Sequence, residues 1–219
     1  QAAGQLEPEL ARRLYAGFER EKGNYAGHEV LFNPGGNLFA YQFSEAWLDT
    51  RRCLDPDGID WFHNTRQATL ANRCFCLDQA SHYRTYHENS WGLSAGDSPW
   101  GYDVSGAPPC RGAPQHNGTV SIFSALAALP FTPEESQAML CYLYQEHPHT
   151  WGEYGFYDAY NLAVSPAWYS RTIYGINKGC SLILLENALS GLVWDIYTNS
   201  ATIQKALAIL RFKSHQQGA

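Results

Sequence analysis

The sequence predicts an all-α fold of about seven helices, with the chemistry on the loops that connect them. Apolar residues recur at helical spacing along most of the chain, and strand-like alternation is nearly absent. Hydrophobic residues make up 45% of the sequence, so the chain can bury a core and is not disordered. The length of 219 residues suits one domain, and we expect residues 1–219 to form a single one.

Three helices are predicted before the first long loop. Pro8 opens the first helix, and Gly23 breaks the pattern that follows it. Its apolar stripe consists of Leu10, Leu14 and Phe18. Apolar spacing predicts the next two helices over about 38–52 and 60–77.

Four more helices are predicted in the second part of the chain. The one that begins at Pro133 has the clearest start, because Thr132 can cap it and Glu135 can complete a capping box. This helix is expected to continue to about Gln145. Apolar spacing predicts the other three over about 119–129, 178–197 and 200–211.

Two aromatic-rich loops between these helices are predicted to carry the functional site. Residues 82–118 contain six Gly and four Pro, and residues 151–161 form a second irregular stretch. Loops longer than about 15 residues are uncommon in compact domains and are usually functional or disordered. Both loops combine acidic residues with Trp and Tyr, which favours a functional interpretation.

Four carboxylates in these loops are candidate catalytic groups: Glu88, Asp97, Glu153 and Asp158. Cleavage of a glycosidic bond needs an acid to protonate the leaving oxygen and usually a second carboxylate. Aromatic surroundings favour the neutral form of an acid by desolvation, as a proton donor requires. The alternative is structural: the acids would only bind loop amides, and Asp158 would cap a helix start.

The neighbouring aromatic and polar side chains are candidates for binding a sugar, because sugar rings stack on aromatic faces and amides bind hydroxyl groups. The predicted substrate-binding residues are Arg66, Asn89, Trp91, Tyr102, Trp151, Tyr154, Phe156 and Asn161. The aromatic ones could instead be core residues. Asp49 is expected in a buried ion pair with Arg51 or Arg66, and Glu186-Asn187 either in a structural polar contact or facing a cavity.

Composition excludes several other functions. The net charge of −6 argues against nucleic acid as a partner, and no apolar run approaches the ~18 residues of a membrane span. The partner indicated is an oligo- or polysaccharide. No cofactor and no metal are expected, since His147-Pro-His149 beside Glu146 is typical of a surface cluster at a helix end.

The cysteines and the start of the chain bear on location. The six Cys form no CxxC pair and are expected to be buried thiols, with room for one or two disulfides. The chain begins at Gln1 without an initiator Met, and Asn117-Gly118-Thr119 is a glycosylation sequon. We expect a secreted or periplasmic location.

Eight motifs occur in order over roughly residues 28–212. They are Leu38-Phe-x-Tyr-Gln-Phe-Ser-x-x-Trp-Leu-Asp49, Gly58-Ile-Asp-Trp-Phe-x-Asn-Thr-Arg66, Glu88-Asn-x-Trp-Gly-Leu-Ser-Ala95, Asp97-x-Pro-x-Gly-Tyr102, Gly118-Thr-Val120, Leu129-Pro-Phe-Thr-Pro-Glu-Glu135, Trp151-Gly-x-Tyr-Gly-Phe-x-Asp-Ala-x-Asn161 and Gly175-Ile176 through Glu186-Asn to Gly191-Leu-Val-Trp194. With this series the chain resembles the C-terminal half of bacterial putative glucoamylases, a family that includes endo-β-1,2-glucanases and a domain of cyclic β-1,2-glucan synthases.

The resemblance implies a partial (α/α)6 toroid with about half the helices of the ring and a cleft formed by loops at one end. It implies metal-free hydrolysis of a β-linked glucan such as β-1,2-glucan, with inversion expected. Glu88 would be the leading general acid, with the other three acids in or beside the cleft. The implied sugar platforms are Trp91, Tyr102, Trp151 and Phe156.

The chain departs from the family pattern at several positions. Asn117 and Asn177 stand where relatives carry acids, and Lys178-Gly-Cys180 replaces Gln-Gly-Pro. Gly96-Asp97-Ser98-Pro99 replaces Ser-Asp-Gly-Pro. A second hypothesis is therefore a non-catalytic relative, a glycan-binding or self-assembling structural subunit. In either case a homo-oligomer or a partner chain could complete the toroid, and a transglycosylase would share the same site.

Overall fold

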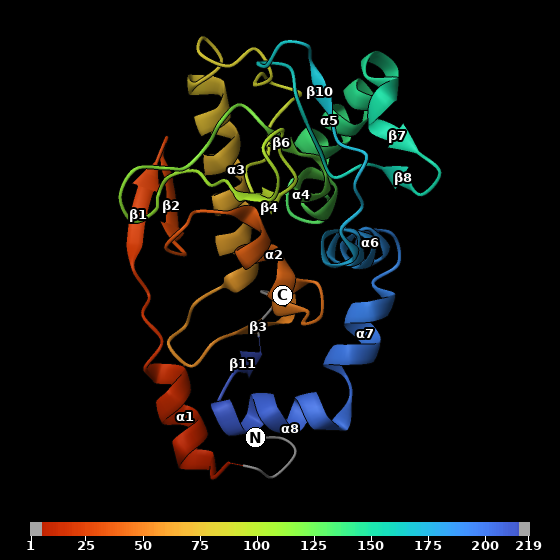
Figure 1. Ribbon diagram of the computed structural model, residues 1–219. Coiled ribbons are helices and arrows are strands. Elements are labelled where there is room, and N and C mark those ends of the chain that lie inside the picture. The colour runs from red at the N-terminus through yellow and green to blue at the C-terminus, as the bar shows by residue number, and fades with distance from the viewer. Residues whose placement is uncertain (1–5, 215–219) are drawn as a thin grey trace.

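The computed structural model describes residues 6–214, and 44% of these residues are helical (Figure 1). The helices are α1 (Pro8–Ala16), α2 (Leu38–Glu45), α3 (Trp61–Asp78), α4 (Ile122–Ala127), α5 (Pro133–Glu146), α6 (Gly175–Leu189), α7 (Leu192–Thr198) and α8 (Ala201–Leu210). Short 3-10 helices span Thr50–Arg52 and Pro148–Thr150.

Short antiparallel strands join these helices, so the all-α expectation is corrected to a helix-rich fold. The pairs are β1 (Lys22–Tyr25) with β2 (His28–Leu31), β3 (Cys53–Leu54) with β11 (Lys213–Ser214), β4 (Ala95–Gly96) with β5 (Asp103–Val104) and β7 (Trp151–Gly152) with β8 (Gly155–Phe156). A three-stranded sheet has the order β10 (Trp168–Tyr169), β9 (Ala159–Asn161), β6 (Val120–Ser121). Strands this short show no alternation in the sequence.

Two predicted helices are divided in the structure. The second ends at Glu45 and continues as a turn into the 3-10 helix, and the sixth is broken at Gly191, whose φ is +73°. Glycine adopts this left-handed backbone without the penalty that a Cβ would bring. As a result α6 and α7 are bent by 98° relative to each other.

The structure differs from expectation in one turn and in one helix cap. Gly23 lies within β1, and the chain reverses at Ala26-Gly27, both with positive φ, to form the β1–β2 hairpin. The Thr132 side chain does not cap α5, because its hydroxyl donates instead to the Ala128 carbonyl at 3.4 Å.

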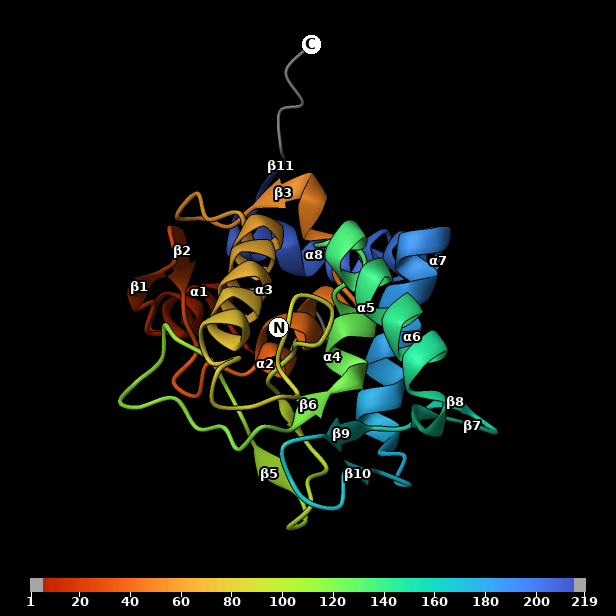
Figure 2. The same cartoon turned by 90° about the horizontal axis from the view of Figure 1, so that it is seen from above.

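Three helices, α2, α4 and α6, contact one another at the centre, and α3, α5 and α7 each pack against the central helix before them. The main core lies among α3, α4 and α5 around Trp91, Leu93 and Tyr160, all fully buried. Strands β5, β6, β9 and β10 and the β7–β8 hairpin gather at one end of α4 and α6 (Figure 2). This end carries the loops that the sequence predicts to be functional.

All six cysteines are free thiols, and Cys141 is the one classed as exposed. Within residues 6–214, no single helix is long and apolar enough to cross a membrane. Among the described helices, the bent α6–α7 pair alone reaches that length and composition jointly.

Candidate active site

Asp97 and Asp158, from the two predicted loops, meet at the N-terminal end of α6. Asp97 follows β4, and Asp158 lies between β8 and β9. Asp158 Oδ2 accepts the backbone N–H of Asp97 at 2.7 Å, while Asn177 Nδ2 from the first turn of α6 donates to Oδ1 at 2.8 Å. Gly96 makes this approach possible, because a Cβ there would lie 2.5 Å from Asp158 Oδ2.

The two carboxylates have different environments. Asp158 is only 4% exposed, and burial raises its pKa, although the hydrogen bonds from Asn177 and the Asp97 amide act in the opposite direction. Asp97 is half-buried, and its carboxylate accepts the Ser170 hydroxyl on Oδ2 at 2.6 Å and the Ser98 N–H on Oδ1 at 3.2 Å. Asp158 therefore holds the loop, whereas the Asp97 carboxylate remains reachable.

A cation lies beside the pair. Lys178 follows Asn177 on α6, and its Nζ donates to the Phe156 carbonyl at 2.5 Å. Burial lowers the pKa of Lys178, and the nearby Asp158 acts against that shift. A carboxylate in place of Asn177 would face Asp158 directly, so the amide makes the site less acidic.

Exposed aromatic rings surround this end of the molecule. Tyr102 is 56% exposed and packs edge-on against Tyr174, with ring centroids 5.3 Å apart. The β7–β8 hairpin presents Trp151 and Tyr154, and Glu153 lies exposed at its turn. The predicted substrate-binding residues Tyr102, Trp151 and Tyr154 therefore have ring surface open to a ligand.

Glu88 lies elsewhere, on an exposed turn closed by backbone hydrogen bonds between His87 and Ser90. Its backbone carbonyl accepts Arg73 Nε of α3 at 3.2 Å, but its carboxylate makes no hydrogen bond or ion pair within the described part of the chain. Asn89 shares the turn and donates its N–H to His87 Nδ1. The structure thus joins Asp97 to Asp158, whereas Glu88 and Asn89 make no hydrogen bond or ion pair with either of them within residues 6–214.

Some predicted binding residues have no free surface. Trp91 is fully buried in the core, and Asn161 is fully buried with its amide bound to the Asn117 carbonyl and the Thr119 hydroxyl. Both predictions are corrected, because packing leaves neither side chain open to a sugar. Phe156 is 9% exposed, and Arg66 lies exposed on α3, away from the loops that carry Asp97 and Asp158.

Sequence reasoning missed four neighbours of the pair: Ser170, Tyr174, Asn177 and Lys178. Asn177 and Lys178 gave a signal, since both depart from the family pattern. Ser170 gave none, because a serine in a short loop between β10 and α6 has no distinctive spacing. Within residues 6–214, no three His, Cys, Asp or Glu side chains converge as a metal site would require.

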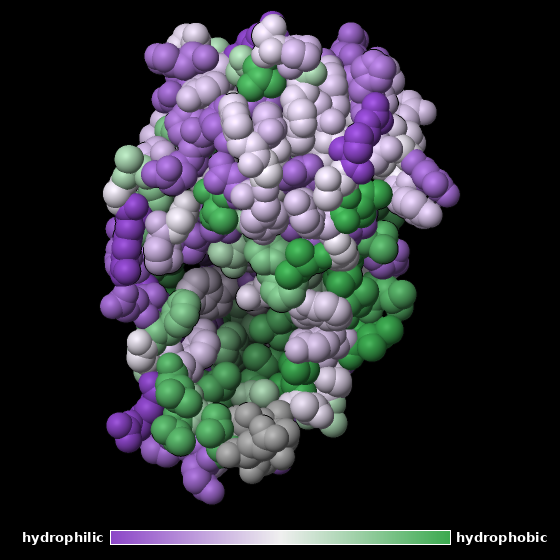
Figure 3. Space-filling model, in the orientation of Figure 1, coloured by the Kyte–Doolittle hydropathy of each residue, from purple (hydrophilic) through white to green (hydrophobic). Residues whose placement is uncertain are grey.

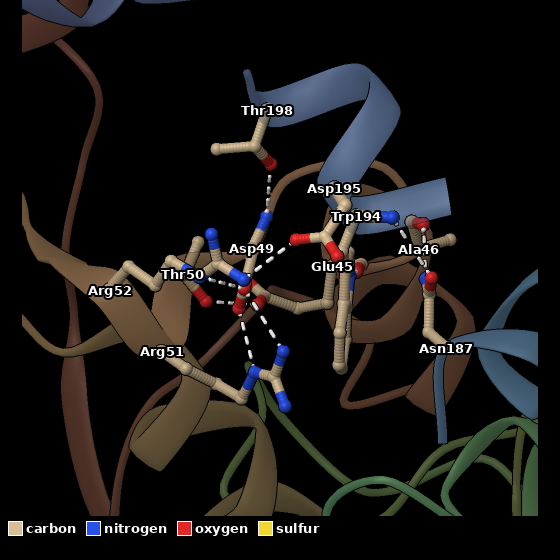
Figure 4. A network of polar contacts seen from close by, with 10 residues as sticks. All are labelled: Glu45, Ala46, Asp49, Thr50, Arg51, Arg52, Asn187, Trp194, Asp195 and Thr198. Atoms are coloured by element: carbon tan, nitrogen blue, oxygen red, sulfur yellow. Dashed lines mark hydrogen bonds and ion pairs between the residues drawn. The ribbon is translucent and has the colours of Figure 1, made fainter. Parts of the chain in front are cut away.

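A second group of buried acids, Glu45 and Asp49, lies at the C-terminal end of α2 and in the turn that follows it (Figure 4). Asp49 is fully buried and accepts Arg51 Nε at 2.7 Å and Arg52 Nε at 2.8 Å. This confirms the buried Asp–Arg pair, with Arg52 rather than Arg66 as the additional partner. The Asp49 N–H donates to the Thr198 hydroxyl at 2.9 Å, which ties α7 to the turn after α2.

Glu45 belongs to the same group. It is 4% exposed, accepts the Thr50 hydroxyl, and has its pKa raised to about 8 by burial. Its backbone carbonyl accepts the Trp194 indole N–H at 2.6 Å, and Asn187 donates to the Ala46 carbonyl at 2.9 Å. Asn187 therefore makes the structural polar contact that the sequence left open.

The helix-rich fold is that of a glucoamylase-like domain. The chain belongs to the family described as putative glucoamylase, whose model matches residues 1–201.

Several known proteins are similar to this chain. An exo β-1,2-glucooligosaccharide sophorohydrolase of Parabacteroides distasonis is 33% identical over 180 residues, which cover 82% of this chain and 24% of that protein. The endo-β-1,2-glucanase of Chitinophaga pinensis, solved with sophorotriose and glucose, is 29% identical with a TM-score of 0.86 over 97% of this chain and 52% of its own. A putative glucoamylase of Bacteroides uniformis is 30% identical, with a TM-score of 0.84 over 95% and 50%. The chain thus spans about half of these solved relatives and a quarter of the curated one.

Proposed function

We propose that this chain is part of a glycoside hydrolase that cleaves a β-1,2-linked glucan. The observation that carries the proposal is the Asp97–Asp158 pair at the loop end of α4 and α6, beside the exposed Tyr102 and Trp151. The names of two relatives, a sophorohydrolase and an endo-β-1,2-glucanase, support β-1,2-glucan as the substrate.

The arrangement of helices supports a partial (α/α)6 toroid. In such a ring inner and outer helices alternate, and here α2, α4 and α6 would be inner while α3, α5 and α7 would be outer. A hollow with apolar surface opens between α1, α7 and α8, and the exposed Leu14 and Phe18 line it (Figure 3). A large exposed apolar surface marks an interaction site. We propose that a complementary half, from the same protein or a partner, covers this surface.

Asp97 is the group that we assign to the chemistry. Glycoside hydrolysis by inversion needs a carboxylate that takes a proton from water and an acid that protonates the leaving oxygen. The Ser170 hydroxyl and Ser98 N–H orient the Asp97 carboxylate as an acceptor, which suits the base. Asp158 positions it through the Asp97 N–H. The proton donor would be Glu153, on the β7–β8 hairpin, or a carboxylate of the complementary half.

A non-catalytic assembly subunit is the second candidate, and the apolar hollow favours it. Measurements of oligomeric state and of glucan cleavage in solution distinguish the two functions. A monomer that releases sophorose from glucan would exclude the assembly function.

Substitution of Asp97 tests the proposal. Asp97→Asn should lower the release of reducing ends from linear β-1,2-glucan by about 10²–10⁴-fold, the usual contribution of acid–base catalysis. Glu88→Gln is the matched comparison and should cost less than about threefold, since its carboxylate contacts no other member of the site. Equal activity of Asp97→Asn and the unmodified protein would overturn the assignment, and a large loss in Glu88→Gln would restore the role implied by the resemblance.

A further inference from the structure

A groove of about 750 Å³ runs between α5 and the C-terminal end of α6. Its volume lies within the range of about 300–1,000 Å³ typical of ligand sites. One face of α5 forms a wall with Pro133, Gln137 and Tyr144, and Leu189 and Trp194 lie opposite. Leu189 belongs to α6 and Trp194 to α7, and these two helices are bent by 98° relative to each other.

The lining of the groove is neutral. Its one charged side chain in the described part of the chain is Arg51, which is already bound to Asp49 and lies 4.1 Å from the centre of the Trp194 ring. The side-chain amides of Gln137 and Gln145 make no hydrogen bond within residues 6–214 and are exposed. The groove thus offers free amide donors and acceptors next to apolar surface, with no fixed charge to match an ionic ligand.

Two aromatic rings form a corner at one end of the groove. Tyr144 is 63% exposed and Trp151 48% exposed, and their rings meet at 90° with centroids 5.6 Å apart. Aromatic faces are large apolar surfaces that the flat C–H face of a sugar ring can cover. A neutral saccharide matches both the rings and the amides, whereas an apolar helix of a protein would leave the amides unpaired.

The groove borders the candidate active site, and Phe156 lies between them. Phe156 lines the groove and also the small pocket that holds Asp158 and Lys178. The β7–β8 hairpin carries Trp151 and Phe156. It lies beside the C-terminal end of α5, at the end of the molecule where the loops gather (Figures 1 and 2). A glucan chain that crossed this hairpin from the Asp97–Asp158 site would reach the groove at the corner formed by Tyr144 and Trp151.

We infer that the α5–α6 groove binds a neutral oligosaccharide, the part of a glucan chain that extends beyond the Asp97–Asp158 site. This inference rests on the proposed function. It predicts that long substrates gain affinity from contacts that short ones do not reach.

The test compares ligands of two lengths on variants of the whole protein. Binding of sophorotriose and of long linear β-1,2-glucooligosaccharides is measured by calorimetry in an Asp97→Asn background, which prevents turnover. Tyr144→Ala should weaken the long ligand about tenfold and leave sophorotriose unchanged, because one aromatic contact is lost. Glu134→Ala, on the same helix outside the groove, is the control and should change neither. The side-chain amide NMR signals of Gln137 and Gln145 should shift with the long ligand only.

Three outcomes would overturn the inference. If wild-type protein cleaves glucan but Tyr144→Ala binds both lengths normally, the groove is not a saccharide site, and the proposed function stands. If the protein neither binds nor cleaves any of these glucans, the proposed function fails and the groove assignment fails with it. If Tyr144→Ala instead abolishes a concentration-dependent dimer, the groove is a protein contact.

Discussion

The Asp97–Asp158 pair and the Glu45–Asp49 group both contain buried acids, but they differ in what satisfies them. Asp49 is neutralised by two guanidinium groups, and Glu45 has a pKa of about 8 and so remains largely protonated at neutral pH. Asp97 and Asp158 are instead held by hydroxyl and amide donors, and the half-buried Asp97 carboxylate remains reachable at the end of the molecule that carries exposed rings.

The difference separates structural acids from candidate catalytic ones. An acid that is paired with arginine joins elements: Asp49 binds Arg52, and Arg52 also pairs with Asp195 of α7. An acid that is held by neutral donors keeps lone pairs free for a substrate. Substitutions should therefore affect stability in the first group and activity in the second.

Asp49→Asn should give the largest loss of stability. Removing one partner of a buried ion pair costs about 3–5 kcal/mol, and the half-exposed Arg51 and Arg52 place this case near 3 kcal/mol. Urea unfolding would measure the loss. Asp195→Asn is the matched control, because the exposed Asp195–Arg52 pair should contribute less than about 1 kcal/mol. Equal losses of stability in Asp49→Asn and Asp195→Asn would contradict the structural role of the buried Asp49.

Glu45→Gln should stabilise the protein at neutral pH. The pKa of Glu45 is raised from 4.5 to about 8 by burial, so the folded state binds a proton that the unfolded state releases. Stability is therefore full below pH 4.5, falls as pH rises towards 8, and is level above that. A neutral Gln avoids this loss and should gain up to about 3 kcal/mol at pH 7. Unfolding curves at pH 5 and pH 8 would show it: a variant with the same pH dependence as the wild type would contradict the assignment.

Ser170→Ala should have the smallest effect, mainly on activity. Loss of the hydroxyl that orients Asp97 should lower kcat about tenfold with KM unchanged, and should cost only about 1 kcal/mol in stability. Ser170→Thr keeps the hydroxyl and should retain activity. A rise in KM instead of a fall in kcat would indicate that Ser170 acts on substrate binding.

The sequence predicted the long helices well and the short elements poorly. Helices α3 and α5 start and end within one residue of expectation, because their apolar spacing is sustained over several turns. The β1–β2 hairpin was missed, since its Ala26-Gly27 turn is a weak signal and its strands are short.

The residue types of the candidate site were predictable from the sequence, but the burial and position of each side chain were not. The rule of acids among aromatic residues selected the loops that contain Asp97 and Asp158, and the structure brings these two together. It could not separate Trp91, which is fully buried, from Trp151, which is exposed, because both lie in Gly-rich loops and only tertiary packing distinguishes them. The hydrogen bond from Ser170 to Asp97 likewise joins residues that lie 73 positions apart in the sequence.

The exposed thiol of Cys141 is a site at which the α5–α6 groove can be labelled chemically. Cys53, Cys76 and Cys180 are buried, so a bulky alkylating reagent or thiol-reactive fluorophore should label Cys141 first. Because Cys141 lines the groove between Gln137 and Tyr144, a dye attached there would report occupancy directly, and a bound ligand would slow the labelling reaction.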